Sequence, residues 1–376
     1  MNDAEAPPEP DRIEGAPHPR ETGRLVGHGA AEAAFLDAYN SGRLHHAWLV
    51  TGPRGVGKAT LAWKIARFLL ATPSAGDAGL FGEAPAPTSL DVDPEHPVSR
   101  RARALAEPGL MLIRRSVNET TKKMSNEIRA EDVRKLRGFF GLSAGDDGKR
   151  VVIIDAADDM NPTAANSLLK LLEEPPKGAV LLLVSHQPSR LLPTIRSRCR
   201  TLRLDPLSPP DLAEALAGAG AEPGTDTAAL GELAGGSVGE ALRLSHLDGL
   251  AAYGEIVRVF ESAPRYDRPS AIALANSATG AANAARFDLL LRLFGLFLAR
   301  LARTGSGHPP PADAAPGEAA LLTRLAPDPW AGRQWATVQQ ELTARASHGR
   351  AVNLDPAALI LDMVFRINET AETRAA

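Results

Sequence analysis

The stretch TGPRGVGKAT, residues 51–60, decides the fold of this chain. It fills the G-x-x-x-x-G-K pattern of a phosphate-binding loop with Gly52, Gly55, Gly57 and Lys58. The apolar run AWLV precedes it and the amphipathic run ATLAWKIARFLL follows it, as expected of a strand entering the loop and a helix leaving it. In such a loop, backbone N–H groups converge on phosphate oxygens at the helix N-terminus, and the lysine adds a charge. The sequence therefore predicts a nucleotide-binding loop inside an α/β module.

The residues that would hold a magnesium ion depart from the pattern of a hydrolase. Ala59 stands where a hydroxyl ligand belongs, and Thr60, one position on, points about 100° away around the helix. The run VVIIDAADDMN ends a predicted strand with Asp155, where a carboxylate would order the ion through water. The next residue, which in hydrolases polarises the attacking water, is Ala156. Lys58 and Asp155 are therefore retained while two groups of the metal chemistry are missing.

Further polar residues lie close to the predicted strand ends. Asp158 and Asp159 follow the strand of Asp155 and are interpreted as a solvated acidic turn, the usual state of a small charge cluster. Ser185 and His186 end the later strand AVLLLVS. These residues alone assign no chemistry.

A cationic cluster surrounds the single cysteine. The segment VSHQPSRLLPTIRSRCR places Arg196, Arg198 and Arg200 around Cys199. An arginine in this position can neutralise charge that develops on a γ-phosphate, within its own chain or across a subunit boundary. From the residues alone, a surface ion pair is the better interpretation of Arg198, and a packed thiol that of Cys199.

Composition limits the partners and surroundings of the chain. The 376 residues carry 42 basic and 45 acidic side chains, so contact with nucleic acid needs a local basic patch. Small candidate patches, each interpreted as a solvated face, are formed by Arg100, Arg101, Arg103, Arg114, Arg115, Lys122 and Lys123. One cysteine excludes an internal disulfide framework, and the first residues do not resemble a secretory signal, which favours the cytoplasm. The most apolar run, residues 287–302, carries charges and is too short to cross a bilayer, so no membrane span is expected.

The order of apolar runs divides the chain into four parts. Residues 1–22 are polar and proline-rich, typical of a disordered tail. Residues 23–206 alternate helical patterns with five β-like runs, AWLV, LMLI, VVIID, AVLLLVS and TLRL, which indicates a mainly parallel sheet covered on both faces. Residues 207–246 and 247–376 carry helical patterns and are expected to form two all-helical bodies. A loop insertion is predicted at 71–100 and a flexible connection at 304–320.

Four stretches, in this order, resemble clamp-loader subunits of the AAA+ class, most closely the bacterial delta prime branch of the DNA polymerase III family. They are RLHHAWLVTGPRGVGKATLA, VVIIDAADDMNPTAANSLLKLLEEPP, SRC at 197–199 and GGSVGEAL at 235–242. The pair NSLLKLLEEPP and SRC is the most specific part, whereas the C-terminal part matches in length and helical character alone. The resemblance implies a AAA+ P-loop module at 23–206, a small helical lid at 207–246, and a helical collar at 247–376 that packs five subunits into a ring.

The resemblance also implies partners and residue roles. The chain would assemble with gamma/tau and delta subunits and, through that complex, act on the sliding clamp and primer-template DNA as a component of the polymerase III holoenzyme. Arg198 would be an arginine finger that reaches the ATP site of a neighbouring gamma/tau subunit. A remnant nucleotide site would be formed by Gly52, Gly55, Gly57, Lys58, Ala59, Thr60 and Asp155.

Three departures from an active clamp-loader ATPase point the same way. Ala59 replaces the magnesium hydroxyl, Ala156 the water-polarising glutamate, and Gly239 the lid arginine that active members carry. Together they favour a subunit that hydrolyses ATP slowly or not at all. Binding of ATP or ADP without turnover stays open, and no zinc is expected because the four-cysteine module of many relatives cannot form. The alternatives are a catalytically active gamma/tau-like or other AAA+ ATPase, and a AAA+ scaffold unrelated to replication.

Overall fold

The computed structural model describes residues 9–13, 16–72, 86–117, 123–141, 148–221 and 226–375. Contacts divide the chain into two compact units, residues 1–220 with 237–239, and residues 221–236 with 240–376. Each unit is described by itself below.

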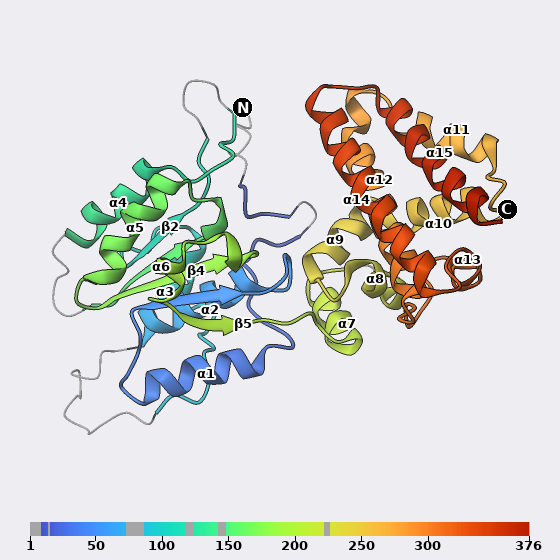
Figure 1. Ribbon diagram of the computed structural model, residues 1–376. Coiled ribbons are helices and arrows are strands. Elements are labelled where there is room, and N and C mark those ends of the chain that lie inside the picture. The colour runs from blue at the N-terminus through green and yellow to red at the C-terminus, as the bar shows by residue number, and fades with distance from the viewer. Residues whose placement is uncertain are drawn as a thin grey trace, which may run out of the picture. The chain divides into compact units, whose positions relative to one another are not determined.

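The first unit is built on a five-stranded parallel sheet with the strand order β2-β3-β4-β1-β5. The strands are β1 (Ala47–Thr51), β2 (Leu110–Ile113), β3 (Arg150–Ile154), β4 (Ala179–Ser185) and β5 (Arg200–Arg203). They coincide with the five predicted β-like runs, so the predicted parallel α/β fold is confirmed. Because every strand runs the same way, the carboxyl ends of β3, β4 and β1 meet at one edge of the sheet (Figure 1).

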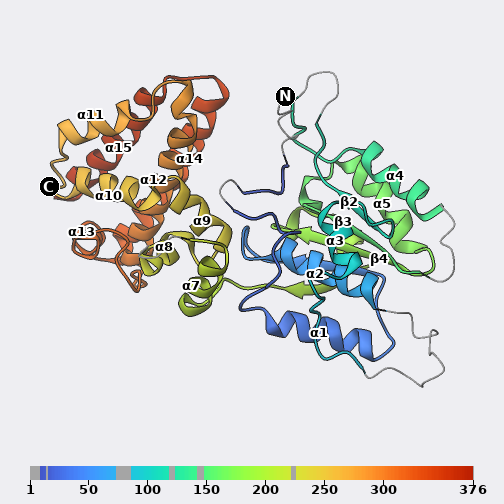
Figure 2. The same ribbon diagram turned by 180° about the vertical axis from the view of Figure 1, so that it is seen from behind.

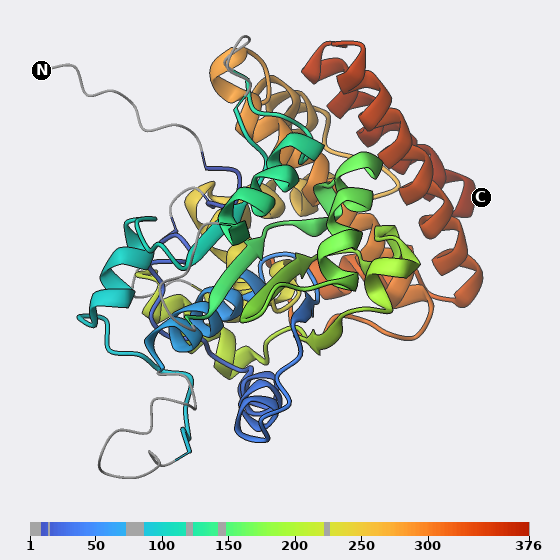
Figure 3. The same ribbon diagram turned by 90° about the vertical axis from the view of Figure 1, so that its left-hand side faces the viewer.

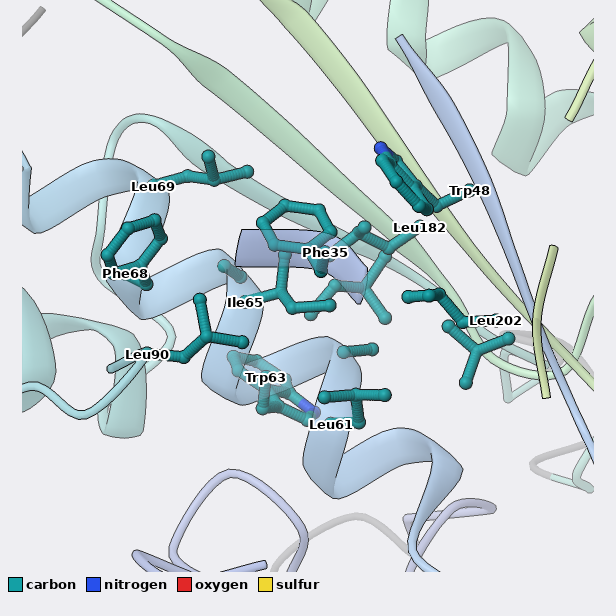
Figure 4. Packing of buried hydrophobic residues seen from close by; sticks show 14 of the residues in the cluster. Phe35, Trp48, Leu61, Trp63, Ile65, Phe68, Leu69, Leu90, Leu182 and Leu202 are labelled. Atoms are coloured by element: carbon teal, nitrogen blue, oxygen red, sulfur yellow. The ribbon is translucent and has the colours of Figure 1, made fainter. Parts of the chain in front are cut away.

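One face of this sheet is covered by α1 (Gly29–Asn40) and α2 (Lys58–Ala71). The helix α2 buries residues on almost every side, since it lies against the sheet and is itself overlaid by other segments. Trp48, Leu61 and Trp63 are fully buried in this cluster (Figure 4). Each large apolar side chain buried in this way stabilises the fold by about 1.5–3 kcal/mol. The helix that leaves the glycine-rich loop is thereby held rigidly.

The opposite face is covered by α4 (Ala130–Gly141), α5 (Pro162–Glu173) and the short α6 (Pro193–Arg196). Figures 2 and 3 show the sheet between these helices and those of the first face. The helix α5 begins as predicted, because the side chain of Asn161 accepts a hydrogen bond from the N–H of Ala164 at 2.9 Å. Of the predicted packing face, Ala165, Leu168 and Leu172 are buried.

Two further helices belong to the first unit, α3 (Pro97–Arg103) and α7 (Pro209–Gly218). Helix α3 lies in the region predicted as a loop insertion, so that prediction missed a short helix. His96 starts it by accepting a hydrogen bond from the N–H of Val98 at 3.2 Å, a cap that the usual list of capping residues omits.

The second unit is all-helical in its described residues. Its helices are α8 (Thr227–Ala234), α9 (Val238–His246, whose first two residues count with the first unit), α10 (Gly249–Phe260), α11 (Arg268–Asn276), α12 (Ala284–Gly305), α13 (Glu318–Leu325), α14 (Pro329–Ala351) and α15 (Pro356–Ala375). The long α12 packs tightly on α14, where Gly305 and Gly332 let the backbones approach: a Cβ on Gly305 would lie 2.5 Å from the Gly332 nitrogen. The apolar run at 287–302 is the buried centre of this unit. Within the described ranges, none of the helices combines the length and apolar character needed to cross a bilayer.

A buried ionic cluster fixes the connection after α12. Arg300 donates to both carboxylate oxygens of Glu318, at 2.6 and 3.1 Å, and to the carbonyl of Ala312 at 3.0 Å. Tyr253 donates to the same carboxylate at 2.6 Å, and the N–H of Ala314 completes the set at 2.6 Å. Residues 304–320 were predicted to be a flexible connection, and this is wrong for residues 312–318, because a long-range ion pair holds them.

The N-terminal residues that the structure describes also pack against the first unit. The His18 side chain is fully buried and its ring meets Trp63 edge-on, with centroids 6.4 Å apart. Arg67 of α2 donates to the carbonyls of Arg20 and Thr22 at 3.1 and 3.3 Å. The polar, proline-rich composition that suggested a disordered tail did not indicate these contacts.

Candidate functional site

The glycine-rich loop joins β1 to α2 and has the backbone shape that its glycines permit. Gly52 has φ +144°, and a Cβ there would lie 2.2 Å from the carbonyl oxygen of Leu204. Gly57 has φ +107° and caps α2, so the first N–H groups of the helix face the loop. His28, buried behind the loop, donates from Nε2 to the carbonyl of Val56 at 2.7 Å. The arrangement is a backbone anion site at a helix N-terminus.

Lys58 is turned onto its own loop. The residue is buried, with 2% of its surface exposed. Its ammonium group donates to the carbonyl of Gly52 at 2.8 Å and to that of Pro53. Burial lowers the pKa of Lys58 to about 8, against the pull of Asp155 and Asp158. The two carbonyl oxygens are neutral partners for this ammonium group. A phosphate bound in the loop would give it an anionic partner.

Asp155 lies directly after β3, in the buried floor of the same site. Burial raises its pKa to about 7, the negative charge of Asp11 adds to the rise, and Lys58 opposes it. Near neutral pH this carboxyl group is therefore held partly protonated. Ala59 has a methyl group where the loop pattern places a hydroxyl ligand. A metal ion would therefore find one partly protonated carboxyl group here in place of a hydroxyl and an ionised carboxylate.

Asp158 ties the ends of two strands together. Its carboxylate accepts a hydrogen bond from the Ser185 hydroxyl at 2.6 Å, and it also accepts from the N–H groups of His186 and Gln187, the latter at 3.1 Å. Asp159 pairs with Arg115 at 3.2 Å. The interpretation of both residues as a solvated acidic turn is therefore wrong for Asp158, whose acceptor capacity is used inside the protein.

His186 stands at the end of β4 beside this network. Burial, with the charge of Lys58, lowers its pKa to about 4. The ring is therefore neutral at physiological pH. Its proximity to Lys58 places a neutral imidazole near the loop.

The segment at 237–239 closes over the loop backbone. The Ser237 hydroxyl donates to the carbonyl of Arg54 at 2.8 Å, and the N–H of Gly239 donates to that of Gly55 at 2.9 Å. A Cβ at Gly239 would lie 2.4 Å from Cδ1 of Ile13 and 3.0 Å from Cα of Gly55. A side chain at this position, which the resemblance aligns with the lid arginine of active clamp-loader ATPases, would therefore press on the end of Ile13 and on the Gly55 backbone.

Arg198 lies at the opposite edge of the sheet. It precedes β5, whose first residue, Arg200, pairs with Trp48 near the beginning of β1, whereas the loop follows the end of β1. Arg200 and the start of the loop are thus four residues apart along the strand direction, a separation of roughly 13 Å. The guanidinium of Arg198 donates to Glu173 at 2.9 Å and to the carbonyl of Thr194 at 3.0 Å, and the side chain remains 36% exposed. Arg198 therefore faces away from its own loop.

The remaining predicted residues fall into place as follows. Cys199 is packed against the α5 face, and burial raises the pKa of its thiol to about 12, which confirms the packed-thiol interpretation. Several of the basic candidates are paired with acidic neighbours: Arg101 with Glu107, Arg103 with Glu95, Arg114 with Glu9 and Asp11, and Arg115 with Asp159. Lys122 lies outside the described residues, and Thr60 lies on α2 beside Ala59, half-buried. The sequence analysis missed His28, because its partner, the Val56 carbonyl, is distant in sequence. It named Asp158 without its partners, which are the Ser185 hydroxyl and two backbone N–H groups.

Comparison with known proteins shows what part of this chain is similar to. A family model described as DNA polymerase III, delta subunit, matches residues 27–208. The chain is 43% identical over 156 residues to the DNA polymerase III subunit delta' of Pseudomonas aeruginosa, a match that covers 41% of each chain. It is 30% identical over 227 residues to the subunit delta' of Bacillus subtilis, covering 59% of this chain and 62% of the relative. These matches thus span about two fifths to three fifths of the relatives' own length. A solved gamma subunit-related protein of Thermotoga maritima aligns over 90% of this chain and 99% of its own with 16% identity and a TM-score of 0.41.

Proposed function

We propose that this chain belongs to the DNA polymerase III delta prime family of AAA+ clamp-loader proteins, because residues 27–208 match the family model and two delta' subunits are 43% and 30% identical over part of the chain. The whole chain then acts as a largely non-hydrolysing clamp-loader subunit. In this proposal it completes a ring with gamma/tau and delta subunits and helps to load the sliding clamp onto primed DNA. The further division into a AAA+ module at 23–206, a lid at 207–246 and a collar at 247–376 belongs to the same proposal.

The placement of Arg198 carries the proposal. A guanidinium that stabilises the transition state of phosphoryl transfer must reach the γ-phosphate, and Arg198 lies at the edge of the sheet away from its own loop. It is partly exposed, and its present partners, Glu173 and the Thr194 carbonyl, are exposed or backbone groups that a stronger anion can replace. We propose that it serves the ATP of a neighbouring gamma/tau subunit.

The loop supports the non-hydrolysing part of the proposal. Lys58 bonds to its own backbone, Ala59 offers no oxygen to a metal ion, and Gly239 stands in place of a sensing arginine. ATP or ADP could still contact the backbone N–H groups and Lys58, so binding without turnover is the remaining capacity of the site.

A reconstituted complex tests the proposal. Arg198→Ala is expected to lower DNA-stimulated ATP turnover and clamp loading, because an arginine finger contributes on the order of 10³-fold at the site it serves. Arg196→Ala, which removes an exposed arginine two residues away, is the matched control and should leave both rates unchanged. Equal rates for the Arg198→Ala complex and the unaltered complex would refute the finger assignment.

The second candidate, an active ATPase, is favoured by the retention of Lys58 and Asp155 side by side. The isolated protein separates the two. The proposal expects no magnesium-dependent ATP turnover above background, whereas turnover that Lys58→Ala abolishes would establish the active enzyme.

A further inference from the structure

The N-terminal residues 9–13, called the strap below, lie against the glycine-rich loop. Cδ1 of Ile13 lies 2.4 Å from the point where a Cβ of Gly239 would stand, and the same point is 3.0 Å from Cα of Gly55. The Ile13 side chain therefore lies against Gly239, whose N–H donates to the carbonyl of Gly55 in the loop at 2.9 Å.

The strap also reaches the carboxylate floor of the site. Asp11 lies close enough to Asp155 for its charge to raise the pKa of that buried carboxyl group. The strap therefore lies near two parts of the site, at Gly239 through Ile13 and near Asp155 through Asp11. The carboxylate of Asp11 brings a negative charge close to where phosphates would need positive charge.

Buried ion pairs hold the strap in this position. Asp11 has a side chain that is 3% exposed and pairs with Arg114, and its Oδ2 lies 3.2 Å from Nε2 of His18. Glu9 accepts from Arg20 and from Arg114, the latter at 3.2 Å. His18 is itself fully buried against Trp63 of α2. Partners on two separate segments of the first unit, residues 18–20 and Arg114, hold the strap, so its position does not depend on a single contact.

We propose that the strap is an autoinhibitory segment that occludes the glycine-rich loop and excludes nucleoside di- and triphosphates from it. The loop keeps its backbone anion site and Lys58, and binding then requires that the strap leave. A ligand that binds only a minor, open state has an apparent affinity equal to its intrinsic affinity multiplied by the fraction of open molecules. Removal of the strap therefore increases the apparent affinity by the inverse of that fraction. The proposal concerns this chain's own loop and is independent of Arg198.

Fluorescence titration of the full chain with a labelled ADP, with and without magnesium, tests this. Two variants open the loop: a chain without residues 2–15, which keeps His18 in place, and Ile13→Ser in the full chain, which keeps every ion pair of the strap. Each is expected to bind the probe at least tenfold more tightly than the unaltered chain. Circular dichroism verifies that both variants stay folded.

Two controls locate the effect. Arg12→Ala changes an exposed strap residue, 48% exposed and paired with Glu9 and Glu21, and should leave the affinity within about twofold. Lys58→Ala in the shortened chain should remove the gain, because the ammonium belongs to the opened site. Equal affinity of the unaltered chain and both variants overturns the proposal, and so does a failure of all three to bind, since occlusion presupposes a competent loop. Neither outcome touches the clamp-loading assay, so the two proposals fail separately.

Discussion

Two clusters of buried charge in the molecule are satisfied in different ways. In the helical unit, Arg300 faces Glu318 in a two-point ion pair, and a tyrosine hydroxyl and a backbone N–H complete the carboxylate. At the loop, Lys58 bonds to carbonyl oxygens, while Asp155 shares its surroundings with another acid, Asp11. The pKa of Arg300 is raised in spite of its burial, whereas the pKa values of Lys58 and Asp155 move towards neutrality.

This difference separates structural charge from charge kept for a ligand. Buried charges that satisfy each other specify one packing arrangement and need nothing further. Buried charges that do not satisfy each other cost stability, and their retention is typical of functional sites. The loop therefore has the electrostatics of a binding site even though its metal ligands are missing.

The largest expected effect is at the satisfied cluster. Glu318→Ala removes the carboxylate that accepts two hydrogen bonds from the buried guanidinium of Arg300 and leaves the more distant carboxylate of Glu232 at 3.4 Å, and we expect the free energy of unfolding to fall by about 3–5 kcal/mol. Urea unfolding followed by circular dichroism measures this. Arg345→Ala, which breaks the exposed pair with Asp362, is the control and should cost less than about 1 kcal/mol. A similar, small loss in both variants would remove the distinction between the two regions.

Asp155→Asn is expected to act in the opposite direction. The pKa of Asp155 in the folded protein, about 7, lies above the ordinary value of 3.8 for an aspartate, so its ionised form destabilises the fold. That cost is absent below about pH 4, grows with rising pH, and is complete above pH 7. The variant should therefore be more stable by about 2 kcal/mol at pH 8, and by less at pH 5. Unfolding at the two pH values measures this, and a variant less stable than the unaltered chain at pH 8 would contradict it.

Gly239→Ala tests the close contact between strap, loop and lid residue. The added methyl group would meet Ile13 and the backbone of Gly55, and we expect a loss of about 1.5 kcal/mol through overpacking. Gly254 of α10 is the matched control, because a Cβ there meets nothing within 4 Å. Gly254→Ala should gain up to about 1 kcal/mol from helix propensity. Thermal unfolding of the pair decides, and a gain in both would show that the space above the loop is open.

The smallest effect is expected for Lys58→Met. The pKa of Lys58 is about 8 in the folded protein, below the ordinary value of 10.5 for a lysine. The charged form therefore destabilises the fold below pH 8, and this cost disappears as the pH rises towards 10.5. We expect a gain of about 1 kcal/mol at pH 7 that shrinks by pH 10. Chemical unfolding at both pH values is the measurement. A gain that is independent of pH would mean that burial of the ammonium costs nothing.

The sequence predicted those parts of the fold that local patterns determine. The five strands are short apolar runs bounded by turns, and the glycine-rich loop has a fixed spacing, so both were placed correctly. The cap of α5 at Asn161 follows from the same local chemistry. The closeness of Lys58 and Asp155 follows from parallel strand order, in which the carboxyl ends meet at one edge.

What the sequence did not predict depends on pairs distant along the chain. Asp158 was assigned to solvent because its partners, the residues after β4, are 27 to 29 positions away. The segment after α12 contains prolines and glycines typical of a linker, yet Glu318 fixes it to Arg300. The strap has a polar composition, and its acids acquire partners such as Arg114 only once the sheet has formed.

One measurement bears most directly on the central claim that this chain assists ATP hydrolysis on a neighbour instead of performing it. Complexes with gamma/tau and delta are assembled with this chain unaltered, with Lys58→Ala, and with Arg198→Ala, and their DNA-stimulated ATP turnover is compared. The account predicts that Lys58→Ala leaves turnover unchanged and that Arg198→Ala removes the share of the one site it serves. Loss of turnover with Lys58→Ala, and none with Arg198→Ala, would contradict it.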